Sequence, residues 1–180
     1  MPDDVLYTTR WNELTREPVG GHRWLSEEEA HRAFESGKGI IEVVDAAARD
    51  ADGTPRPRWV IGTSANGRAR VRFFTPGGSV WRNIDYDEID GRLWRWISVT
   101  YTYPDLDNRY MQGQALQIVK EKFQPDGTGT VRHDVKTEPE VDVYTMSDVP
   151  VAGFWLDRPR FGDWAALTDP EYGLPARDVT

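Results

Sequence analysis

The sequence predicts an α+β protein that is mostly β, with a short N-terminal helix followed by seven or eight antiparallel strands. Helix signals are concentrated in residues 27–36, and three turn sequences separate the segments that favour β structure after residue 58. One of these segments, residues 93–103, would extend roughly 36 Å at about 3.3 Å per residue, too long for a flat strand in a chain of this size. The strands are therefore expected to form a barrel or a strongly cupped sheet.

The helix is expected over residues 27–36. Ser26 is an N-cap residue, and Glu29 stands three positions later, where it completes a capping box. Gly37 supplies the stop, because glycine readily adopts the backbone conformation that ends a helix.

A strand is expected over residues 40–46, and a polar loop separates it from an antiparallel meander over residues 58–148. The turns of the meander are Asn66-Gly67, Asp90-Gly91 and the loop 125–129, and a last strand is expected at 141–146.

Residues 149–180 contain prolines, glycines and aromatic residues. They are too apolar for a free tail, so we expect a strap that packs on the sheet. Together with an arm, helix and loop over 1–57, this gives a single domain over 1–180.

The strand count and the meander resemble the calycin type of ligand-binding barrel in architecture alone, because its Gly-x-Trp signature near the first strand is not convincingly present. The alternative is a cone-shaped α+β fold of the NTF2-like type. Both shapes leave a cavity between the strands and a covering element. A shared fold does not by itself assign a function.

The Asp90-Gly91 hairpin predicts two different faces. Its turn places Tyr86 opposite Arg95, Ile84 opposite Ile97 and Val80 opposite Tyr101. One face is then aliphatic and suits a core, whereas the other mixes tryptophan with Asp, Asn, Ser and Thr, a composition that can stack on a planar ligand and bond its edge. The candidate ligand-binding residues of the chain are Trp94, Trp96, Arg95, Tyr101, Tyr103, Tyr144, Trp81 and Asp85.

A candidate catalytic pair comes from the third hairpin. If the loop 125–129 joins Gln124 to Thr130, Glu121 lies opposite His133 on an otherwise apolar face. A carboxylate that orients an imidazole and raises its basicity would make a general base, although such pairs are more often structural.

Composition limits the partners. The 180 residues carry a formal net charge of −8, which argues against nucleic acid or an anionic membrane as a partner. The absence of cysteine and the spacing of the three histidines predict no metal site, and no cofactor motif is present. No signal peptide or membrane-spanning run is recognised, so a cytoplasmic location is expected.

These observations predict a protein that binds an aromatic or amphipathic small molecule, or a cofactor-independent enzyme with a His/Glu base. The alternative is an acidic, non-catalytic module, such as an inhibitor or an immunity-type protein, that covers a basic protein. A monomer or a homodimer fits either function.

Overall fold

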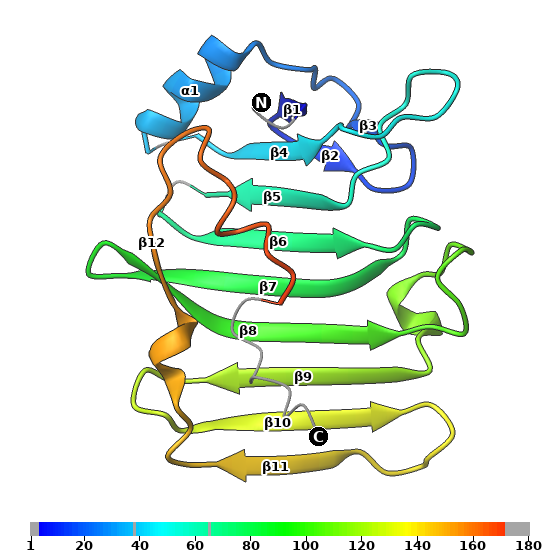
Figure 1. Ribbon diagram of the computed structural model, residues 1–180, viewed down its shortest axis with the longest axis vertical. Helices are drawn as coiled ribbons and strands as arrows, with labels where there is room; N and C mark the ends of the chain where they lie inside the picture. The colour runs from blue at the N-terminus through cyan, green and yellow to red at the C-terminus, as the bar shows by residue number, and fades with distance from the viewer. Residues whose placement is uncertain (1–3, 38, 65, 172–180) are drawn as a thin grey trace.

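A computed structural model describes residues 4–37, 39–64 and 66–171, and most of its described strands form one antiparallel sheet (Figure 1). The strand order is β1-β4-β5-β6-β7-β8-β9-β10-β11, and β12 pairs with β8. The bounds are β1 (Val5–Thr8), β4 (Ile41–Asp45), β5 (Trp59–Thr63), β6 (Ala69–Phe74), β7 (Val80–Ile89), β8 (Arg92–Thr102), β9 (Gln117–Phe123), β10 (Gly129–Val135), β11 (Asp142–Met146) and β12 (Trp155–Asp157). The predicted α+β, mostly β class is confirmed.

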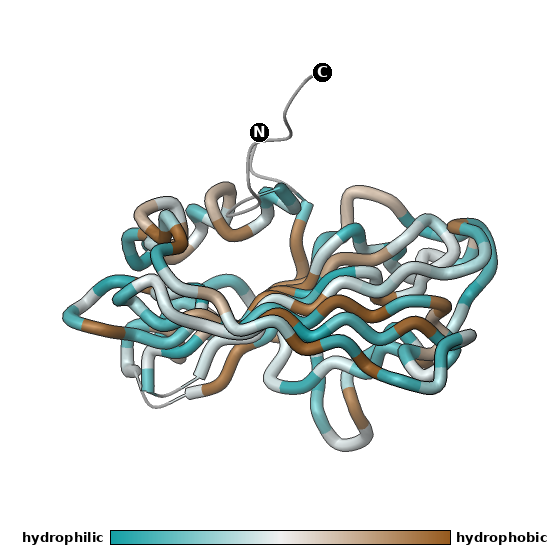
Figure 2. Tube along the Cα trace, turned by 90° about the horizontal axis from the view of Figure 1, so that it is seen from below, coloured by the Kyte–Doolittle hydropathy of each residue, from teal (hydrophilic) through white to brown (hydrophobic). Residues whose placement is uncertain are grey.

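The sheet is open, so of the two predicted shapes the calycin-like barrel is wrong and the cupped sheet remains. In the part of the chain that the structure describes, β1 pairs only with β4 and β11 pairs only with β10, so these two strands form opposite edges. Figure 2 shows that the strands instead twist strongly about the middle of the sheet. Twist and two register irregularities, at β6/β7 and β7/β8, accommodate the long strands without closure.

The helix α1 (Glu27–Glu35) forms where its signals predict. The Ser26 side chain accepts a 3.2 Å hydrogen bond from the Glu29 backbone N–H, and the Glu29 carboxylate accepts one of 2.9 Å from the Ser26 N–H. Gly37 follows with a positive φ of 61°. The cap sets where the helix begins. Ala30 is fully buried against the sheet and therefore marks the side of the helix that faces the core.

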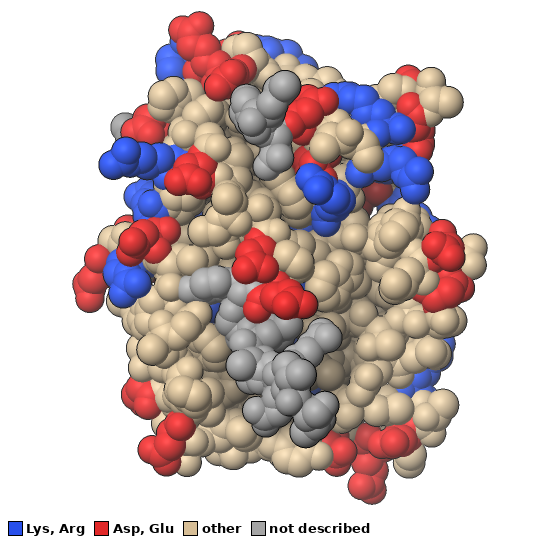
Figure 3. All heavy atoms as spheres, in the orientation of Figure 1, with Lys and Arg blue, Asp and Glu red and all other residues tan. Residues whose placement is uncertain are grey.

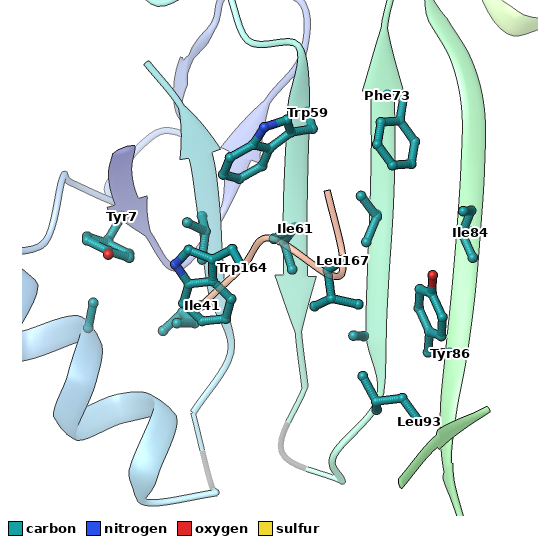
Figure 4. Close-up of a cluster of buried hydrophobic side chains, with 14 residues drawn as sticks. Tyr7, Ile41, Trp59, Ile61, Phe73, Ile84, Tyr86, Leu93, Trp164 and Leu167 are labelled. Atoms are coloured by element: carbon teal, nitrogen blue, oxygen red, sulfur yellow. The ribbon is translucent and has the colours of Figure 1, made fainter. Parts of the chain in front are cut away.

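The larger core lies between the sheet and a layer made of α1 and the C-terminal strap, which cover the same face (Figure 1). Figure 4 shows the strap residues Trp164 and Leu167 beside Ile41 and Ile61. Leu167 is only 1% exposed, which confirms that the described part of the strap, up to residue 171, packs on the sheet. Residues 172–180 lie outside the described residues.

A second, smaller core lies on the opposite face, under the hairpin of β2 (Trp11–Asn12) and β3 (Glu17–Pro18). Its buried residues are Trp11, Val44, Val60, Phe74 and Val80. Both faces of β4 and β5 are therefore covered, which explains why these strands read as continuous apolar runs rather than as an alternation.

The central hairpin confirms the predicted turn but not the whole predicted register. Tyr86 pairs with Arg95 as expected, whereas Ile84 pairs with Ser98 rather than Ile97. The shift leaves Trp96 as an extra residue in β8 and exchanges the faces beyond it. Ser98 and Thr100 consequently join the face of Arg82 and Ile84.

The third hairpin has a shorter loop than predicted. Gln124 N–H donates to the Thr128 carbonyl over 2.8 Å, and Asp126 tightens the turn by accepting from the Thr128 N–H over 2.9 Å. Because the strands then pair two residues away from the prediction, Glu121 lies opposite Val131 and His133 lies opposite Val119. The predicted cross-strand pair of Glu121 and His133 is wrong.

The described residues include no helix with the length and apolar character needed to cross a membrane.

Candidate functional site

The two residues predicted as a catalytic pair have other partners. The Glu121 carboxylate lies 3.3 Å from the guanidinium of Arg95, which is buried and also lies 3.8 Å from the Phe154 ring centroid. The His133 ring contacts the side-chain amide of Gln117. These contacts do not give His133 the carboxylate partner that the general-base hypothesis requires.

The predicted aromatic residues are distributed over several packing contacts. Trp94 is buried against Phe154 and Trp155, and its indole N–H donates to the Phe123 carbonyl over 3.3 Å. Trp96 is half-buried, with Lys122 Nζ 5.5 Å from its ring centroid.

The remaining predicted residues lie elsewhere on the sheet. Tyr101 and Tyr103 stack on each other, with Tyr103 donating to the Val80 carbonyl over 2.8 Å. Trp81 packs near Phe73, and Tyr144 is exposed on β11. The predicted residues therefore do not line one cavity.

Asp85 belongs to a series of ion pairs across β6 and β7. Its carboxylate lies 2.5 Å from the guanidinium of Arg70, and that of Asp87 lies 2.5 Å from the guanidinium of Arg68. These cross-strand pairs give Arg68, just before β6, and Arg70 of β6 a structural role on the surface of the sheet.

A cleft lies instead among loops at one end of the first half of the sheet. Its volume is about 690 Å³. At the upper right of Figure 3, near the loop that joins β4 to β5, Lys and Arg side chains lie together with Asp and Glu side chains. The lining residues that carry charge or a large apolar side chain are Trp11, Glu13, Leu14, Arg16, Asp50, Arg56, Pro57, Arg58, Phe74, Pro76, Asp107 and Arg109.

The β2–β3 hairpin forms the first wall. The backbone N–H of Trp11 donates to the Glu42 carboxylate, and Arg72 of β6 lies 2.6 Å from the Glu13 carboxylate. At the hairpin turn, Arg16 has a positive φ of 57° and lies 2.5 Å from Asp50. These contacts fix the hairpin to the sheet and to the opposite loop.

The loop 46–58 forms the second wall. Asp45, fully buried at the end of β4, accepts from the backbone N–H of Arg58 over 2.9 Å and from its side-chain Nε over 2.8 Å. The Arg58 side chain is nevertheless 64% exposed. Asp45 therefore orients an arginine that a ligand in the cleft can reach.

Arg56 reaches the cleft from the same loop. Its guanidinium donates to the Pro76 carbonyl over 3.1 Å and lies 3.5 Å from Asp50, and its side chain is 51% exposed. Pro55 and Pro57 flank it and restrict the backbone at two of the four positions from 55 to 58.

The loops 75–78 and 105–109 form the third wall. The Gly77 N–H donates to the Leu106 carbonyl over 2.8 Å, and the Gly77 Cα approaches the other loop so closely that an added Cβ would lie 2.5 Å from the Asp107 carbonyl. From this loop Arg109 donates to the backbone carbonyls of Glu13 and Leu14. The third wall is thus joined to the first.

The lining of the cleft combines charged and apolar side chains. Four arginines and three carboxylates line it, whereas the whole chain has 22 basic and 30 acidic residues. Trp11 and Phe74 belong to both the lining and the second core, so they form the floor of the cleft and expose only a small apolar surface to it. Among the residues that the structure describes, no group of three or more His, Asp or Glu side chains is arranged to hold a metal ion.

Sequence reasoning did not identify this cleft. Its arginines come from four segments that only the fold brings together, around positions 16, 56, 58 and 109. The one local signal is Pro55-Arg56-Pro57-Arg58, in which prolines stiffen a segment that carries two cations.

Comparison of the chain with protein-family models, with curated proteins and with solved structures found no match.

Proposed function

We propose that the protein binds a small amphipathic organic anion in the cleft bounded by the β2–β3 hairpin and the loops 46–58, 75–78 and 105–109. The observation that carries this proposal is the position of exposed arginines, Arg56 and Arg58, above a floor that contains Trp11 and Phe74. Guanidinium groups bind carboxylates and related oxyanions through paired hydrogen bonds, and the floor shields the apolar part of the ligand from water.

The size of the cleft supports a ligand of this kind. Its volume of about 690 Å³ falls within the roughly 300–1,000 Å³ typical of small-molecule sites. Its arginines are also held in place before a ligand binds, because Asp45 and Asp50 orient them. Such preorganisation lowers the entropic cost of binding.

Fluorescence of anilinonaphthalene sulfonate tests the proposal, since this probe combines an aromatic body with one negative charge. We expect saturable binding with one probe per chain. Arg58→Gln should weaken binding about tenfold, because a charged hydrogen bond is lost. Arg68→Gln is the matched control, since Arg68 is similarly exposed, at 60%, and paired with a carboxylate outside the cleft.

A steric variant locates the probe independently of charge. Ala48 is an exposed residue that lines the cleft, whereas its neighbour Ala47 is exposed and lies outside the lining. Ala48→Trp should reduce binding and Ala47→Trp should not. Equal probe binding by the wild type, Arg58→Gln and Ala48→Trp would contradict the proposal.

This function contains no catalytic step, because the Glu121–His133 pair that motivated one is not formed. The acidic protein-binding module stays a prediction. On the face shown in Figure 3, the acidic side chains lie in several separate groups and give that alternative no single patch to support it.

A further inference from the structure

We infer that the ligand carries a single negative charge, in the form of a carboxylate on an aromatic or alicyclic body. Arg56 and Arg58 are the residues that bind this carboxylate. This inference rests on the proposed function and specifies its ligand class. It distinguishes such a molecule from a phosphorylated one and from a neutral one.

The charge of the lining limits the charge of the ligand. The four arginines are opposed by Glu13, Asp50 and Asp107, so the lining has a formal charge of +1. Behind the second wall, Asp45 offsets Arg58 further. With Asp45 counted, these groups carry no net charge, so the carboxylates disfavour a ligand with several phosphate charges. A single carboxylate needs only the local attraction of the exposed Arg56 and Arg58.

The arginines of the cleft differ in how far their side chains are exposed, although Arg58, like Arg109, is held by two side-chain hydrogen bonds, which it donates to Asp45. Arg109 donates through both terminal nitrogens to backbone carbonyls of the hairpin, and the Arg16 side chain is 32% exposed and 2.5 Å from Asp50. Arg56 lies farther from Asp50, at 3.5 Å. Together with Arg58 it presents the more exposed side chains of the three ion-paired lining arginines.

Arg56 and Arg58 are carried by one supported loop. They are two positions apart in the sequence, with Pro57 between them, and both line the cleft. The loop is also closed on itself, since Arg56 N–H donates to the Ala48 carbonyl over 2.8 Å and Asp50 N–H donates to the Thr54 carbonyl over 2.8 Å. Two guanidinium groups on a supported loop suit an anion that accepts paired hydrogen bonds.

The apolar body of the ligand is assigned to the floor. Trp11 and Phe74 are 5% and 8% exposed, and Leu14, at 59% exposed, stands at the hairpin side of the cleft. A ligand with an apolar body would cover part of the exposed Leu14 side chain. The hydrophobic effect would then add to its binding free energy, which a small inorganic anion cannot achieve.

The test uses three probes with the same body and different charged groups, namely naphthoate, naphthyl phosphate and naphthylmethanol. Each competes with anilinonaphthalene sulfonate on the full chain, at low ionic strength and near neutral pH. We expect naphthoate to bind about tenfold more tightly than either of the other two. Both Arg56→Gln and Arg58→Gln should abolish the preference over naphthylmethanol, and Arg68→Gln should retain it.

The outcomes separate this inference from the proposed function. Tighter binding of naphthyl phosphate, or equal binding of naphthylmethanol, would overturn the single-carboxylate assignment while leaving a small-molecule cleft in place. Failure of all probes, including anilinonaphthalene sulfonate, to bind a chain with an unchanged circular dichroism spectrum would overturn both.

Discussion

The two halves of the sheet are built differently. Strands β4 to β6 lie between α1 and the strap on one face and, in part, the β2–β3 hairpin on the other, and they contain many of the fully buried aliphatic residues. At the opposite edge every residue of β11 is exposed. The cleft opens at the loops of the half that is covered on both faces. The packing that stabilises the fold therefore also makes the walls of the cleft rigid.

The largest expected effect is on the unfolding free energy when a buried side chain is truncated in the doubly covered half. The same kind of truncation at the exposed edge is the comparison. Ile61→Ala empties space around a side chain with no exposed surface and should cost about 2–5 kcal/mol of unfolding free energy. Val143→Ala on β11, where Val143 is 62% exposed, should cost less than about 0.5 kcal/mol. Urea unfolding measures both, and similar costs would contradict the proposed difference between the halves.

An intermediate effect is expected where the loop after β8 meets the loop before β7. Gly77→Ala forces the loop 105–108 away and should cost about 1–3 kcal/mol, in the range of overpacked sites. Gly113→Ala, in the connection between β8 and β9, is the control, because nothing lies within 4 Å of its added Cβ. Urea unfolding should separate the variants, and Gly77→Ala should also weaken binding of anilinonaphthalene sulfonate through displacement of Arg109.

The smallest expected effect is local to the loop 105–110 and depends on pH. The hydrogen bond from the Tyr110 hydroxyl, of 2.6 Å, is the main cause that lowers the pKa of Asp105 to about 2, and bonds from Asn108 add to it. Because this pKa lies below the unfolded value of about 3.9, the loop contacts are complete above about pH 4 and are lost as the pH falls towards 2.

Carbon-detected NMR titration of the Asp105 carboxyl group measures this effect. In Tyr110→Phe the pKa of Asp105 should rise towards its ordinary value, because the largest stabilising bond of the carboxylate is gone. Identical titration curves in the two proteins would show that the loop is not held as described.

Several elements could be predicted because their signals are local. Ser26 and Glu29 determine the helix start through bonds between neighbours, and Asp90-Gly91 fixes the pairing of Tyr86 with Arg95. The bulge at Trp96 was not predicted, because an alternating pattern carries no mark of where one extra residue is accommodated. The predicted strand register of the third hairpin was wrong for a similar reason. Asp126 shortens the loop through a side-chain hydrogen bond that the alternating pattern does not reveal.

The open sheet and the cleft depend on distant parts of the chain. Alternation within a strand is the same in a barrel and in an open sheet, so it could not exclude closure. The cleft needs β1 and β4 to pair across the intervening hairpin and helix, and it needs the loop 105–109 to contact the hairpin. Such contacts are the result of tertiary packing, which no short motif encodes.

The position of the strap sets an order of events during synthesis. Trp164 packs on Phe34 of α1, and Leu167 enters the core beside Ile61, so the largest core is completed by residues translated near the end of the described chain. Until then the ribosome carries a nascent sheet whose apolar face lacks part of its cover. Such long-range closure slows folding and exposes aggregation-prone surface. The growing chain therefore exposes part of this core face until Trp164 and Leu167 have been translated.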